Sequence, residues 1–210
     1  SVTAFTGEAL AQSGISGAAE YLALTPNVGF SEDGQTGSRG VGIAIRGVGN
    51  VVSGETAFIN SVGIYLDEFS VASVPNQVAN PQLPDVERIE VLRGPQGTYF
   101  GRNSLGGALN ITTKKPTDEF EGEITLGFED FDGAGDAYNV TGVINIPVSD
   151  TFRMRAVANF EDSDGLVENI NPTGNDSGHE FGAFRLNTVW DASDSTTVST
   201  TLFYTEEEQG

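Results

Sequence analysis

The C-terminal part of the sequence alternates apolar and polar residues in one segment after another. In the segment 123–129, Ile124, Leu126 and Phe128 share one face, and the residues between them are charged, polar or glycine. A period of two is the mark of an extended strand with two chemically different faces. The pattern therefore predicts five antiparallel strands within residues 123–129, 138–146, 152–161, 184–191 and 197–204.

The connections between these strands alternate in length. Residues 147–150 and 192–195 predict tight turns, whereas 130–136 and 162–180 predict longer polar loops. Alternating loop lengths, charged residues at strand centres and aromatic residues near strand ends are typical of an outer-membrane β-barrel. A soluble antiparallel sandwich alternates in the same way and stays open as the alternative. The aromatic residues concerned are Phe128, Tyr138, Phe152, Phe160, Trp190 and Tyr204.

Composition excludes several classes of function. The 210 residues carry a formal charge of −20, which argues against nucleic acid as a partner. The chain has no cysteine, so it has no disulfide framework. It also has no thiolate that could act as a nucleophile or bind zinc. The single histidine, His179, cannot form a multi-histidine metal cage. We therefore predict no catalytic residues, no metal site and no cofactor.

The composition changes after Pro116. Residues 1–116 have a net charge of −3 and residues 117–210 one of −17, and the break coincides with a Lys-Lys-Pro turn. The first part mixes short helical and strand patterns, which indicates a small α+β domain with much loop. Its predicted helices are residues 7–13 and 17–24, with a helical turn at 84–88, and its predicted strands are 40–47, 62–67, 89–93 and 108–113.

Three motifs with fixed spacing stand out in residues 1–116. Residues 43–49 read IAIRGVG and residues 62–67 read VGIYLD. Residues 86–114 contain IEVLRGP, followed by YFG, a Gly-Gly pair and LNITTK. Together these motifs resemble the plug domain of TonB-dependent outer-membrane receptors, the last one nearly position by position. One departure is Glu68, which stands where the family usually has glycine.

The resemblance implies a fold in two parts. Residues 1–116 would be the plug domain, and residues 117–210 the first strands of a transmembrane β-barrel. About five strands of an expected twenty-two would be present, so this incomplete barrel could neither close nor transport by itself. We expect the sequence to be a piece of a longer protein, with a signal peptide and the TonB-contacting segment before Ser1.

The resemblance also suggests which residues matter. Glycines of the plug motif would allow tight turns and close approach of backbones inside a barrel. Arg46 and Arg93, each beside a glycine, are expected on strands facing a polar lumen and paired with carboxylates of the barrel wall. The candidate residues for the plug motif and the plug–barrel contacts are Arg46, Gly47, Arg93, Gly94, Pro95, Tyr99, Gly101, Gly106, Gly107 and Asn110.

The function implied by the resemblance is active uptake of a scarce ligand across the bacterial outer membrane, with the plug gating the barrel lumen. The expected partners are a TonB-type energy-transducing protein, an extracellular ligand such as a ferric siderophore, and outer-membrane lipid. Uptake of glycans, haem or cobalamin remains an alternative. A passive outer-membrane channel and a soluble β-rich binding module are further alternatives, and no residue pattern indicates an enzyme.

Overall fold

The computed structural model describes residues 2–12, 22–33, 40–49, 61–67, 69–70, 84–100, 104–130, 135–164 and 178–209. The chain divides into two compact units, Ser1–Lys114 and Lys115–Gly210. The division lies two residues before the boundary that the Lys-Lys-Pro turn predicts. In the described residues no helix is both long and apolar enough to cross a membrane.

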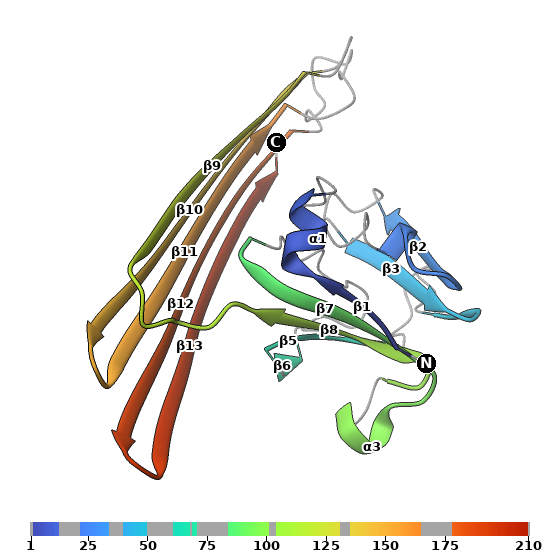
Figure 1. Cartoon of the computed structure of the whole chain (residues 1–210). Coiled ribbons are helices and arrows are strands. Elements are labelled where there is room, and N and C mark those ends of the chain that lie inside the picture. The colour runs from blue at the N-terminus through green and yellow to red at the C-terminus, as the bar shows by residue number, and fades with distance from the viewer. Residues whose placement is uncertain are drawn as a thin grey trace. The chain divides into compact units, whose positions relative to one another are not determined.

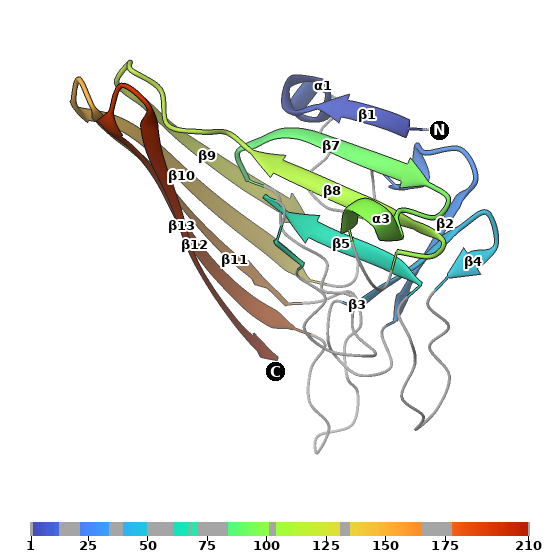
Figure 2. The same ribbon diagram turned by 90° about the horizontal axis from the view of Figure 1, so that it is seen from below.

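The first unit is organised around a five-stranded sheet (Figure 2). The strand order is β1-β7-β8-β5-β6, and only the pair of β5 with β8 is parallel. The central strands β7 and β8 therefore receive backbone hydrogen bonds from both sides. The strands are β1 (Val2–Thr6), β5 (Val62–Leu66), β6 (Phe69–Ser70), β7 (Val86–Arg93) and β8 (Gly107–Thr113).

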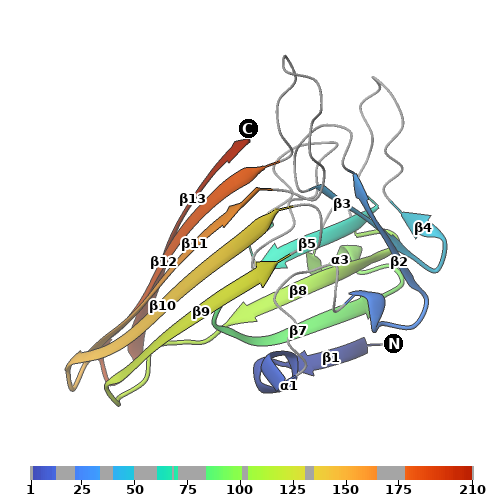
Figure 3. The same ribbon diagram turned by 90° about the horizontal axis from the view of Figure 1, so that it is seen from above.

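A second sheet and short helices complete the described part of the unit (Figure 3). The sheet runs in the order β2 (Val28–Asp33), β3 (Gly40–Ile45) and β4 (Val48–Gly49). The helices are α1 (Gly7–Gln12) and α3 (Gly97–Phe100). Helix α1 begins where the Oγ1 of Thr6 accepts a hydrogen bond from the Ala9 amide at 3.3 Å, as an N-cap does.

The core of this unit lies on one face of the five-stranded sheet. Alternate residues of β5, β7 and β8 pack there against Ile43 and Ile45 of β3 and against Leu10 and Leu22. The largest fully buried side chains of the three sheet strands are Val62, Ile64, Ile89, Val91, Leu109 and Ile111. Burial of each such aliphatic side chain stabilises a fold by about 1.5–3 kcal/mol.

One predicted element of the first unit differs from the structure, and another lies mostly outside the described residues. The helical turn at 84–88 is wrong, because residues from Val86 onward belong to β7. A positive φ of 62° at Asp85 turns the chain directly into the strand, where β1 and β8 satisfy its backbone groups. Of the predicted helix at 17–24, residues 17–21 lie outside the described residues.

The second unit is an antiparallel sheet of five sequential strands (Figure 1). All five predicted strands are confirmed, and each is longer than the alternating segment that predicts it. Tight turns at residues 150–151 and 194–195 join two of the pairs. The strands are β9 (Glu121–Asp130), β10 (Asp136–Ser149), β11 (Phe152–Ser163), β12 (His179–Ser193) and β13 (Thr196–Gln209).

Candidate functional site

One face of the second sheet is covered with exposed apolar side chains. The register places Ile124, Leu126 and Phe128 on the same face as apolar residues of the other four strands. Ile124 is 78% exposed and Leu126 is 74% exposed. A soluble sandwich would bury such a face, so this exposure favours contact with lipid. The other exposed apolar residues on this face are Tyr138, Val140, Ile144, Phe160, Phe184, Trp190, Val198, Leu202 and Tyr204.

The opposite face of the same sheet carries partnered polar groups. Arg155, only 4% exposed, places its Nη1 2.9 Å from the Oε2 of Glu121. The Oδ1 of Asn159 accepts hydrogen bonds from Asn139 at 3.0 Å and from Thr141 at 2.7 Å. Buried polar groups normally keep such partners. Polar side chains on this face thus have partners on neighbouring strands, as expected for strands around a wet lumen.

The plug motif forms a compact turn between β7 and β8. The amide of Gly94 donates to the carbonyl of Gly106 at 3.0 Å, and that of Gln96 donates to Ser104 at 3.0 Å. Gly94 has a φ of 98°, which a residue with a side chain rarely adopts. Pro95 then leads towards α3, which contains Tyr99, while Gly101 lies outside the described residues.

The glycine pair at the start of β8 permits close packing. A Cβ atom on Gly107 would lie 2.4 Å from the carbonyl oxygen of Leu92 and 2.7 Å from the Cδ1 of Ile45. A Cβ on Gly106 would lie 3.0 Å from both the carbonyl oxygen and the Cγ1 of Val48. The motif glycines therefore let β8 approach β7 and the β3–β4 hairpin more closely than other residues could.

Arg93 ties three segments of the first unit together. Its Nη2 donates to the Oγ1 of Thr3 at 2.8 Å, and its Nη1 donates to the carbonyl oxygen of Pro26 at 3.2 Å. The side chain thus links the end of β7 to β1 and to the turn before β2. The pairing of Arg93 with a carboxylate of the barrel wall stays a prediction.

We expect Arg93→Ala to loosen this domain in the whole receptor. The change removes two charge-assisted hydrogen bonds, which together stabilise the plug by about 2 kcal/mol. Faster proteolysis of the plug and greater passive leakage through the receptor are the expected results. Arg88→Ala is the matched control, because Arg88 is exposed on the same strand. Equal proteolysis and leakage in the two variants would contradict the role of Arg93.

Arg46 was expected on a strand, but it lies in a turn. Strand β3 ends at Ile45, which pairs with Val48 across a two-residue hairpin. The φ angles of Arg46 and Gly47 are 53° and 79°, so both central residues are left-handed, as a type I′ turn requires. The turn also brings Val48 against Gly106, so two of the three motifs meet here.

Asn110 lies away from these residues, on the other face of the five-stranded sheet. Its Nδ2 donates to the Oε2 of Glu90 across the β7–β8 pair at 3.0 Å. The same carboxylate lies 3.6 Å from the Nε of Arg88. Asn110 therefore belongs to a small polar cluster on β7 and β8, separate from the packing of the motif turn.

Two further residues of the second motif have structural roles that sequence reasoning did not assign. The hydroxyl of Tyr65 donates to the carbonyl of Phe100 at 2.8 Å, and the two rings lie 4.6 Å apart, which holds α3 beside β5. Burial raises the pKa of Tyr65, so its hydroxyl stays a donor. The carboxylate of Asp67 accepts two hydrogen bonds from Thr113, at 2.9 and 2.6 Å. The only sign of these roles in the sequence was that Tyr65 and Asp67 belong to the motif VGIYLD.

Among the described residues, no group of three or more His, Cys, Asp or Glu side chains is arranged to hold a metal ion. The one histidine, His179 on β12, places its Nε2 3.1 Å from the Oε1 of Glu161 on β11. Both side chains are largely buried on the polar face. This pair is a cross-strand contact of the sheet.

Comparison with known families gives the context for both units. The family description "TonB-dependent Receptor Plug Domain" matches residues 1–108. The chain belongs to this family. The TonB-dependent receptor plug thus accounts for the first unit up to the start of β8, including the motif turn.

Individual relatives agree with this assignment. The pesticin receptor of Yersinia enterocolitica is 35% identical over 104 residues, which is 49% of this chain and 14% of that receptor. The crystal structure of the siderophore receptor PirA from Acinetobacter baumannii is 25% identical, with a TM-score of 0.76 over 98% of this chain and 31% of that one.

A third similar protein is a variant of the ferric enterobactin receptor PfeA from Pseudomonas aeruginosa, solved in complex with enterobactin. It is 21% identical, with a TM-score of 0.77 over 98% of this chain and 33% of that receptor. Both solved receptors match the two units of this TonB-dependent receptor chain, which spans a third or less of their length and about a seventh of the pesticin receptor.

Proposed function

We propose that the chain forms the plug and the first barrel strands of a receptor that takes up a ferric siderophore across the bacterial outer membrane. The observation that carries this proposal is the plug-domain match over residues 1–108, followed in the same chain by a sheet with one apolar and one polar face. The names of similar proteins, a siderophore receptor and a ferric enterobactin receptor, support an iron-carrying ligand.

The apolar face has the dimensions of an outer-membrane wall. Phe152 and Trp190 lie in register near the short turns, and Phe160 follows eight residues along β11. The nine residues from Phe152 to Phe160 match the about 9–11 residues with which a tilted strand crosses a membrane. Outer-membrane barrels present an apolar band about 25 Å tall between two aromatic girdles. We infer that lipid covers this face.

The plug would gate the lumen, and energy would come from a TonB-type protein acting on a segment N-terminal to the plug. The function proposed is transport without catalysis. The substrate class is the least specific part of the proposal, because glycan, haem and cobalamin receptors have the same architecture in this family.

Uptake by cells tests the proposal. A strain without the gene should lose accumulation of radioactive iron supplied as ferric enterobactin or another ferric siderophore, and the gene should be induced by iron limitation. Dissipating the proton gradient should abolish uptake in the complemented strain. Undiminished uptake of every siderophore offered, with induction by a sugar, would favour a glycan receptor. Uptake that persists without the gradient would indicate a passive channel.

A further inference from the structure

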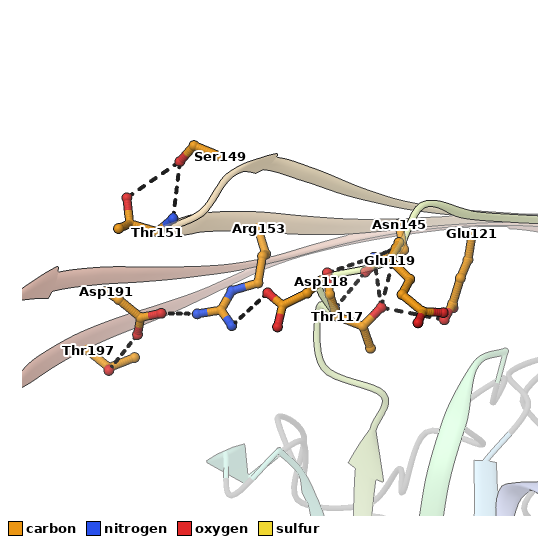
Figure 4. A network of polar contacts seen from close by, with 10 residues as sticks. All are labelled: Thr117, Asp118, Glu119, Glu121, Asn145, Ser149, Thr151, Arg153, Asp191 and Thr197. Carbon is orange, nitrogen blue, oxygen red and sulfur yellow. Dashed lines mark hydrogen bonds and ion pairs between the residues drawn. The ribbon is translucent and has the colours of Figure 1, made fainter. Parts of the chain in front are cut away.

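The short segment 117–121, just after the end of the plug, is bound to the polar face of the second sheet (Figure 4). The Oδ1 of Asn145 on β10 accepts the amide hydrogen of Thr117 at 3.0 Å. The Nδ2 of Asn145 lies 3.0 Å from the carbonyl oxygen of Thr117 and 2.5 Å from that of Glu119. One side-chain amide thus holds the backbone of the segment at two residues.

Charged contacts extend this attachment to other strands. Asp118 accepts a hydrogen bond from the Nη1 of Arg153 at 3.1 Å, and the Nη2 of Arg153 is bonded to Asp191 of β12 (Figure 4). Glu121 lies 2.9 Å from the guanidinium of Arg155 on β11. The segment is therefore connected to β10, β11 and β12 in addition to continuing into β9.

Asn145 is the centre of this attachment. Its side chain is completely buried, and its register partners are Arg155 on β11 and Glu121 on β9. Loss of its amide would remove hydrogen bonds that the segment makes to a buried side chain, which is costlier than losing a fully exposed contact. The Asp118–Arg153 pair is more exposed on its Asp118 side, so its contribution is smaller.

We propose that residues 117–121 are a mechanical anchor that stops unfolding of the plug at Pro116 when the plug is pulled from its N-terminal side. This inference rests on the proposed function, in which an energy-transducing protein pulls the plug. Pulling on the chain from the side of β8 loads the contacts of Asn145 and Arg153 before it loads the first backbone hydrogen bond of β9. Asn145 and Arg153 act as positioning residues, because they hold the segment that follows Pro116 on the second sheet.

Pulling on single molecules of the whole receptor in a membrane tests the anchor. The protein is held at constant force through its N-terminal end, and the lifetime of the state in which the plug is extended and the anchor segment is still attached is measured. We expect Asn145→Ala to shorten this lifetime at least about tenfold, since the variant loses every hydrogen bond that the completely buried Asn145 amide makes to the segment. Release of residues 117–120, which precede β9, should add at most about 1.4 nm to the extension.

Asn139→Ala is the matched control. Asn139 lies on the same strand and face, but its amide bonds to Asn159 on β11 and not to the anchor segment. Its lifetime should equal that of the unmodified receptor. Equal lifetimes for Asn145→Ala and the unmodified receptor would overturn the anchor.

Hydrogen exchange on the unmodified receptor covers the case in which Asn145→Ala fails to assemble. The Thr117 amide should exchange at least about tenfold more slowly than a free peptide, and exchange at the free-peptide rate would refute the attachment. Neither readout depends on transport. A negative result in the uptake experiment would therefore not contradict the anchor. A negative result in the pulling experiment would not contradict siderophore uptake.

Discussion

Lysine in place of Ile124 is expected to prevent assembly of the receptor in the outer membrane. Ile124 is in the middle of the apolar side of β9 and is 78% exposed, so a change to lysine breaks no packing within the sheet. In lipid, a lysine near the bilayer midplane costs about 2–4 kcal/mol. The amount of receptor in the outer-membrane fraction, measured by immunoblotting, should fall strongly.

Thr125→Lys is the control for this prediction. Thr125 is the next residue on β9 and belongs to the polar face, where its hydroxyl lies 3.4 Å from the carboxylate of Glu123. A lysine there meets water and a neighbouring carboxylate, so assembly should be close to normal. Equal amounts of the two variants in the membrane would mean that the apolar face does not contact lipid, and a soluble sandwich would again be the better reading of β9–β13.

Alanine in place of Gly107 is expected to disrupt the plug. A single Cβ would lie 2.4 Å from the backbone oxygen of Leu92, and a backbone atom cannot move aside without breaking the β7–β8 pair. We expect a loss of about 3 kcal/mol in plug stability, at the upper end for overpacking by one methyl group. Limited proteolysis of the whole receptor should show the plug cut at lower protease concentration.

Gly97→Ala tests whether the loss is specific to Gly107. Gly97 opens α3 in the same motif, and a Cβ there would meet no atom within 4 Å. Alanine also favours the helix, so the plug of this variant should resist protease as well as the unmodified one. A plug that tolerates Gly107→Ala equally well would show that the close approach of β8 to β7 is not needed for stability.

The five strands of the second unit could be predicted because their signal is local. Each strand shows its two faces in its own residues, as the alternation around Ile124 does. The extensions could not be predicted, because the ends of β10 and β12 take their pairing from neighbouring strands. The run Glu206–Glu208, for example, resembles an exposed loop in sequence but continues β13, where Glu208 pairs with Glu180.

The first unit was less predictable from its residues alone. Local propensity suggests a helical turn at 84–88, whereas pairing with β1 and β8 makes this segment the start of a central strand. The expectation that Arg46 lies on a strand was wrong for a similar reason, since a pair of positive φ angles leaves no trace in composition. The contacts of Arg93 join residues 67 and 90 positions apart, a relation that no short motif contains.

The role of Asn145 could not be predicted from the sequence either. In sequence it is one polar residue in an alternating strand, with nothing to separate it from Asn139. Its part in holding Thr117 depends on a chain segment 28 residues earlier, so only the folded chain reveals it.

The order of the second sheet, β13-β12-β11-β10-β9, has a practical consequence. Within the described strands, β9 and β13 each pair on one side, so each presents a row of backbone donors and acceptors to any strand of matching length. An extended segment of another polypeptide could therefore pair with either edge by β-augmentation.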